Sequence, residues 1–192
     1  MVESIQTRQM APEETNFTLQ IADLNKYGQA LNNCESVEEV VSLTLEAVSL
    51  LFELPYTTFV EVRDGNLRVV HSTYPEVAAG DEPGTVAYEA YESEDTTVRS
   101  GSAAGEGDAP VGATLAVPAA STGDVVAIIV TRSIEHRTFG DEMVRALEIL
   151  ATHAATAIGN IRSRERLERA RRDLEKRKEM VEMYDRLLRH DL

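Results

Sequence analysis

The sequence predicts an α+β fold, with an antiparallel sheet that has helices on both sides and is followed by a long C-terminal coiled-coil helix. Two hairpin turns, Asp64-Gly65 and Ser121-Thr122-Gly123, each join two apolar runs, and such turns connect antiparallel strands. The run 125–130 is apolar on both faces, which is typical of a central strand covered on both sides. From Asp141 to the end, the apolar residues recur at helical spacing.

The remaining elements follow from local signals. Residues 1–16 are polar and aperiodic, so we expect a flexible leader, and a helix is expected over 17–32. Ser36 and Glu39 form a capping-box pattern that begins a second helix ending near Glu53. The other expected elements are strands at 56–63 and 66–74, a short helix at 84–92, a short strand at 96–99, a mobile loop at 100–112, and strands at 114–119 and 124–131.

The last helix changes its pattern along its length. From residue 167 onward, a seam with a seven-residue repeat has Leu167, Leu174, Val181 and Leu188 at positions a, and Ala170, Arg177 and Tyr184 at positions d. A helix over 141–192 would be about 78 Å long, which is too long to be buried on a domain of this size. Because a lone projecting helix with an apolar seam is marginal in water, the pattern predicts a parallel homodimer.

The net charge of the chain also changes along this last helix, near Gly159. The net charge is −14, and only three of the 19 basic residues are lysine. Residues 1–158 hold 25 acidic and 8 basic residues, a net charge of −17, whereas residues 159–192 carry +3. An acidic, lysine-poor surface is typical of proteins that work in high salt, where charges are strongly screened. It also argues against general binding of nucleic acid, which requires lysine and arginine.

Composition limits the setting and the chemistry. The N-terminal sequence lacks the apolar segment of a signal peptide, and no apolar run approaches the length of a membrane span. We therefore expect a cytoplasmic segment. Cys34 is the single cysteine and the four histidines are scattered, so no metal site is expected. Glycine-rich phosphate loops are absent from the sequence.

Residues 17–161 resemble a GAF domain. The resemblance rests on Leu115-Ala116-Val117-Pro118, the apolar run 125–130, and Phe139-Gly140-Asp141-Glu142 leading into a helix rich in leucine and alanine. It implies a sensor domain with a pocket for a small molecule. Phe59, His71, Tyr88 and Tyr91 are the candidate ligand-binding residues, although such a set also suits a core. Residues 162–192 would then be a signalling helix.

The final residues, Leu187-Leu188-Arg189-His190-Asp191-Leu192, resemble the first part of the H-box of histidine kinases, in its haloarchaeal form. The resemblance implies that His190 is the phosphoacceptor and Asp191 its acid/base neighbour. It also implies an N-terminal fragment of a two-component kinase whose missing domain uses ATP, with a response regulator as partner. No cofactor is expected for residues 1–192, which should be inactive alone.

Two alternatives share the same fold. In the first, the chain is the dimerising GAF regulatory domain of a transcription regulator with no kinase activity, and His190 is an ordinary surface residue on a polar helix. In the second, it is a purely structural dimerisation domain with a filled pocket.

Overall fold

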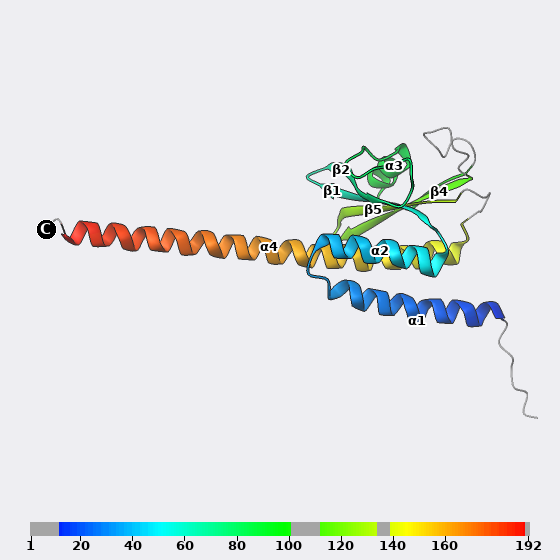
Figure 1. The fold of residues 1–192 in the computed structure, drawn as a ribbon, viewed down its shortest axis with the longest axis horizontal. Coiled ribbons are helices and arrows are strands. Elements are labelled where there is room, and N and C mark those ends of the chain that lie inside the picture. Colours follow the sequence, from blue (N-terminus) through cyan, green and yellow to red (C-terminus); the bar gives the residue numbers. More distant parts are fainter. Residues whose placement is uncertain (1–11, 101–111, 134–138, 191–192) are drawn as a thin grey trace, which may run out of the picture.

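The computed structural model describes residues 12–100, 112–133 and 139–190, and its architecture is the predicted α+β fold (Figure 1). The strands form one antiparallel sheet, and the last helix extends far beyond it. The elements are α1 (Pro12–Asn32), α2 (Val37–Phe52), β1 (Tyr56–Arg63), β2 (Asn66–Ser72), α3 (Thr85–Ser93), β3 (Thr97–Ser100), β4 (Ala113–Ser121), β5 (Asp124–Ser133) and α4 (Asp141–His190).

The sheet has the strand order β2-β1-β5-β4-β3, so β5 lies at its centre as its apolar sequence predicted. Every pair of neighbouring strands is antiparallel. Both hairpin turns contain the left-handed residues that tight turns require: φ is 52° at Asp64 and 77° at Gly65, and 54° at Thr122 and 93° at Gly123. The turn chemistry therefore identified both hairpins correctly.

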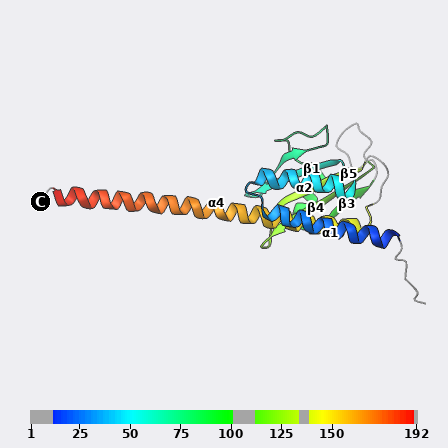
Figure 2. The ribbon, with the colours of Figure 1, turned by 60° about the horizontal axis from the view of Figure 1, so that its bottom comes forward.

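The two faces of the sheet carry separate apolar cores. Helix α3 covers one face, where Val86, Ala87 and Ala90 pack against Val60 and Ile128. Helices α2 and α4 cover the opposite face, and α1 packs on the outside against both of them (Figure 2). The prediction of helices on both sides is confirmed.

The start of α1 differs from the prediction. The helix begins at Pro12, five residues before the expected start, so residues 12–16 of the predicted leader are helical, and residues 1–11 lie outside the described residues. Proline suits the first turn of a helix because its missing N–H needs no partner there. The first turn is polar and has no apolar periodicity, so the sequence pattern did not indicate that it is helical.

Helix α2 begins as its capping pattern predicted. The Ser36 hydroxyl accepts a hydrogen bond from the backbone N–H of Glu39 at 3.2 Å. The Glu39 carboxylate accepts one from the N–H of Glu35 at 2.8 Å, one residue earlier than in a standard capping box.

Helix α4 is a single element of 50 residues, about 75 Å long. Its first part lies in the core, where Leu147, Leu150 and Ile158 are almost completely buried. The second part of the helix projects from the domain (Figure 1). Every side chain from Ser163 to Arg186 is exposed in the single chain. Among the described helices, none has both the length and the apolar character to cross a membrane.

Candidate functional site

A cluster of charged side chains lies at the point where α4 leaves the domain. Ile161 is the last buried residue of α4, with 3% of its surface exposed, and Arg162 follows it. Gly159, three residues before Arg162, lies close to the β4–β5 turn, because a Cβ added there would lie 2.9 Å from the Ser121 Oγ. The helix therefore passes directly beside the end of the sheet before it projects.

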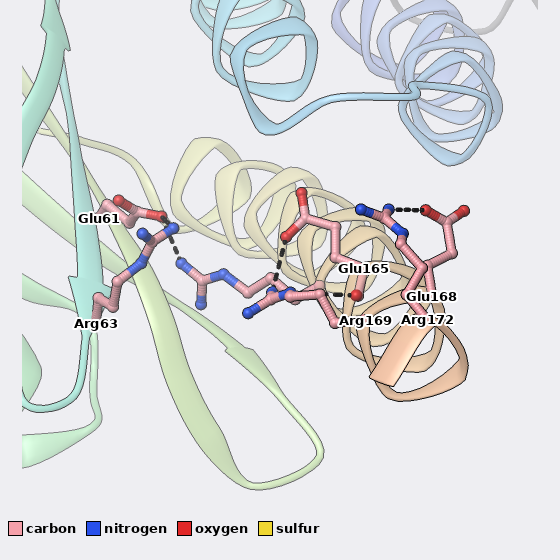
Figure 3. Close-up of polar contacts among 7 residues, drawn as sticks. Glu61, Arg63, Glu165, Glu168, Arg169 and Arg172 are labelled. Atoms are coloured by element: carbon pink, nitrogen blue, oxygen red, sulfur yellow. Dashed lines mark hydrogen bonds and ion pairs between the residues drawn. The ribbon is translucent and has the colours of Figure 1, made fainter. Parts of the chain in front are cut away.

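Arg162 connects the helix to strand β1. Its Nη2 lies 2.6 Å from the Glu61 Oε1, and both terminal nitrogens donate to the Val62 carbonyl oxygen at 3.4–3.5 Å. The side chains of Arg162 and Glu61 are only 16% and 17% exposed. The same Glu61 oxygen accepts from the Arg63 Nη2 at 3.1 Å (Figure 3). One carboxylate thus holds an arginine of the sheet and an arginine of the helix.

A groove of about 750 Å³ lies beside this contact, between the two hairpin turns, the end of α3 and the outgoing helix. Its two sides differ in charge. Most of the carboxylates come from the turns and from the end of α3, and the arginines come mainly from α4. The charged residues that line it are Asp64, Glu92, Glu94, Asp124 and Glu165, together with Arg63, Arg162, Arg166 and Arg169.

The projecting part of α4 combines local ion pairs with exposed apolar side chains. Arg169–Glu165 and Arg172–Glu168 are pairs four residues apart on this helix, at 3.5 and 3.4 Å (Figure 3). Such exposed pairs add only about 0.3–0.5 kcal/mol each. Of the seam, Leu167 is 71% exposed, Leu174 65% and Val181 62%. This apolar strip has no partner within the described part of the single chain.

The predicted phosphoacceptor lies at the far end of this helix. His190 is the last residue of α4, and Asp191 lies outside the described residues. About 28 residues of helix, or roughly 42 Å, separate His190 from Arg162. Within the described residues, α4 is the element that connects the sheet to His190.

The four predicted ligand-binding residues do not line one cavity. Phe59 is fully buried in the core beneath α2 and α4, whereas Tyr91 packs against the core beneath α3, on the opposite face of the sheet. Tyr88 is 37% exposed and His71 is exposed. Successive residues of a strand point to opposite faces of the sheet, and the sequence alone does not show which face a given residue points to. Phe59 points to the face covered by α2 and α4, away from α3. Only Tyr91 contributes to the groove.

Cys34 lies between α1 and α2, and it is buried. Its thiol donates to the Ala30 carbonyl oxygen at 3.5 Å. Burial raises the pKa of the Cys34 thiol, and the nearby Glu39 carboxylate raises it further. The thiolate is therefore scarce at neutral pH, which makes this cysteine unreactive. Within the described residues, no group of three or more potential metal ligands comes together.

Sequence reasoning missed the Glu61–Arg162 contact. The two residues are 101 positions apart, and a charged residue in a strand gives no sign of its partner. The available signal was the change of net charge near Gly159, which marked the right region without identifying the pair.

A family model and several solved structures match this chain. The model described as "GAF domain" matches residues 36–160. A GAF domain of a phosphoenolpyruvate-protein phosphotransferase from Coxiella burnetii is similar over 78% of this chain and 98% of its own, with a TM-score of 0.65 and 16% identity.

Two further solved structures have the same fold. The GAF domain of a two-component sensor histidine kinase from Bacillus halodurans has a TM-score of 0.59 and 16% identity, covering 69% of this chain and 99% of its own. A free methionine-R-sulfoxide reductase from Neisseria meningitidis has a TM-score of 0.65 and 16% identity, covering 77% and 92%. No curated protein matches the sequence significantly. The family match, supported by this fold, shows that the chain belongs to the GAF-domain family.

Proposed function

We propose that this GAF signalling domain is the sensory module of a two-component histidine kinase of haloarchaeal type, and that it relays a signal through a dimeric helix to the phosphoacceptor His190. The observation that carries the proposal is the continuity of α4. One helix begins in the core at Asp141, passes the Glu61–Arg162 contact, and ends at His190. A change in packing around the sheet can therefore move a distant histidine without an intervening hinge.

A second copy of the chain is the proposed partner of the projecting helix. The seam residues Leu167, Leu174 and Val181 are exposed in the single chain, and burying each would contribute about 1.5–3 kcal/mol. Arg177 lies at a d position, where it weakens the seam. A weak seam lets two helices shift in twist or register at small cost, which is what a two-state relay needs.

The proposed chemistry is transfer of the γ-phosphoryl group of ATP to the His190 imidazole. With Leu188 at position a, His190 lies at position c, away from the seam, where a kinase domain could reach it. Asp191 would orient the ring or accept its proton. The ATP-binding domain and the response regulator would be supplied by the parent kinase system, and the cytoplasm is the proposed location.

The test is phosphorylation of the complete gene product with ATP radiolabelled at the γ-phosphate. We expect label that is labile in acid and stable in base, as phosphohistidine is, and we expect His190→Gln to abolish it. His136→Gln, which changes a histidine with no proposed role, is the matched control and should keep the label. Label that persists in the His190 variant, or an absence of any label, would favour the dimerising regulatory domain of a transcription regulator.

A further inference from the structure

Glu61 is shared by two arginines that belong to different parts of the molecule. Arg63 lies on the same strand and is 67% exposed, whereas Arg162 lies on α4 and is 16% exposed. The contact with Arg162 is the shorter, at 2.6 Å against 3.1 Å. Glu61 therefore has a second cationic partner in place if Arg162 withdraws.

The Glu61–Arg162 pair is incompletely satisfied. The Arg162 Nε is buried and has no hydrogen-bond partner among the described residues. A buried donor without a partner costs free energy, and desolvation offsets much of the attraction within a partly buried ion pair. The contact is thus well positioned but weaker than its short distance suggests.

Arg162 also has alternative partners. Asp64, Glu92, Glu94 and Asp124 line the same groove as Arg162. In the part of the chain that the structure describes, none of these four carboxylates forms a side-chain hydrogen bond or an ion pair. If the pair opens, the arginine can turn toward these acids while Glu61 keeps Arg63. Both charges then still have partners. The main cost of breaking such a pair, a buried charge without a partner, is therefore avoided.

The pair also lies where it can connect the two faces of the sheet. Val60 and Val62 pack in the core beneath α3, while Glu61, between them on β1, faces α4. A shift of β1 caused by an event on the α3 face would move the Glu61 carboxylate relative to α4. The Val62 carbonyl oxygen, which Arg162 also contacts, would move with it.

We propose that the Glu61–Arg162 contact is a releasable latch that fixes the direction in which α4 leaves the GAF domain, with Arg63 and the groove carboxylates as the exchange partners. Its role in regulating the relay rests on the proposed function. The latch itself does not, because it is a property of residues 1–192 without ATP or a kinase domain.

The experiment measures the distance between the domain and the projecting helix by pulsed electron paramagnetic resonance. Spin labels are attached at Asn66→Cys, beside the groove, and at Glu179→Cys on α4, in a Cys34→Ala background. Dilution with unlabelled chain removes distances between copies. We expect one narrow distance distribution for the parent protein and an additional, displaced population for Glu61→Gln and for Arg162→Gln.

Arg169→Gln is the matched control. Arg169 lines the same groove, but its ion pair is with Glu165 on its own helix, so its loss should leave the distribution unchanged. Arg63→Gln distinguishes a releasable latch from a purely structural cluster. It removes the second arginine that pairs with Glu61 and leaves the carboxylate to Arg162. We expect this variant to keep the single narrow distribution of the parent protein, whereas a merely structural role for the cluster would broaden it.

Three results would overturn the latch: an unchanged distribution in Glu61→Gln and Arg162→Gln, broadening in Arg63→Gln, or broadening in the Arg169 control. Circular dichroism identifies any variant that has failed to fold, and Glu61→Asp then replaces Glu61→Gln as a milder probe of the same contact. Failure of His190 labelling would leave these distances untouched, so the two proposals fail separately.

Discussion

The two parts of α4 belong to one helix, but different interactions stabilise them. Residues 141–161 place Leu147, Leu150 and Ile158 in the core of the domain, whereas the side chains of residues 163–186 are all exposed in the single chain. The first part is stabilised by tertiary packing, and the second by helix propensity and weak local ion pairs. The core of the domain uses only the first part, and we propose that a second copy of the chain covers the second part.

The largest effect is expected from a cavity in the packed part. Leu150 is fully buried, so Leu150→Ala should lower the free energy of unfolding by about 3 kcal/mol. Its neighbour Ile149 is 46% exposed, and Ile149→Ala should cost less than about 1 kcal/mol. Urea unfolding followed by circular dichroism measures both. Equal costs would show that residues 141–161 are not packed as described.

A smaller effect is expected where α1 packs on α4. A Cβ added at Gly28 would lie 2.8 Å from the His153 Nε2, so Gly28→Ala should displace the ring and cost about 1 kcal/mol. In a His153→Ala background, the same change should instead stabilise by up to about 1 kcal/mol, because alanine favours helix. Both values come from urea unfolding. The same sign in both backgrounds would contradict the close contact.

The smallest effect on the fold is expected in the projecting part. Leu174 is 65% exposed, so Leu174→Ala should change the unfolding free energy of the dissociated chain by less than about 0.5 kcal/mol. The measurement is urea unfolding at the lowest protein concentration that gives a signal. A cost comparable with that of Leu150→Ala would show that the seam packs within its own chain.

The seam also predicts a gain. Arg177→Leu places an apolar residue at a d position, and the dissociation constant of the dimer should fall about tenfold, which corresponds to about 1.4 kcal/mol. Sedimentation equilibrium measures the constant, and Lys176→Leu, at an outer position, is the control. Similar effects of both variants would show that added leucine promotes nonspecific hydrophobic association, and not pairing through a specific seam.

Much of the fold could be predicted because its signals are local. The Asp64-Gly65 turn, the cap at Ser36 and the apolar run in β5 each depend on neighbouring residues alone, and the structure has all three. The site was harder to predict, because it depends on which residues meet across the fold. Phe59 is a predicted pocket residue, but the structure places it in the core beneath α2 and α4, on the face of the sheet opposite α3. The sequence pattern does not indicate that Glu61 contacts Arg162. The functions proposed for His190 and Asp191 remain predictions.

The most direct test of the account is the mass of the 192-residue chain in solution, measured by multi-angle light scattering in concentrated salt over a range of protein concentrations. Pairing through the seam predicts twice the chain mass of 21.2 kDa, and Leu174→Lys should shift the mass toward a single chain. A mass of one chain at every concentration, or a dimer that the Leu174 variant leaves intact, would contradict it.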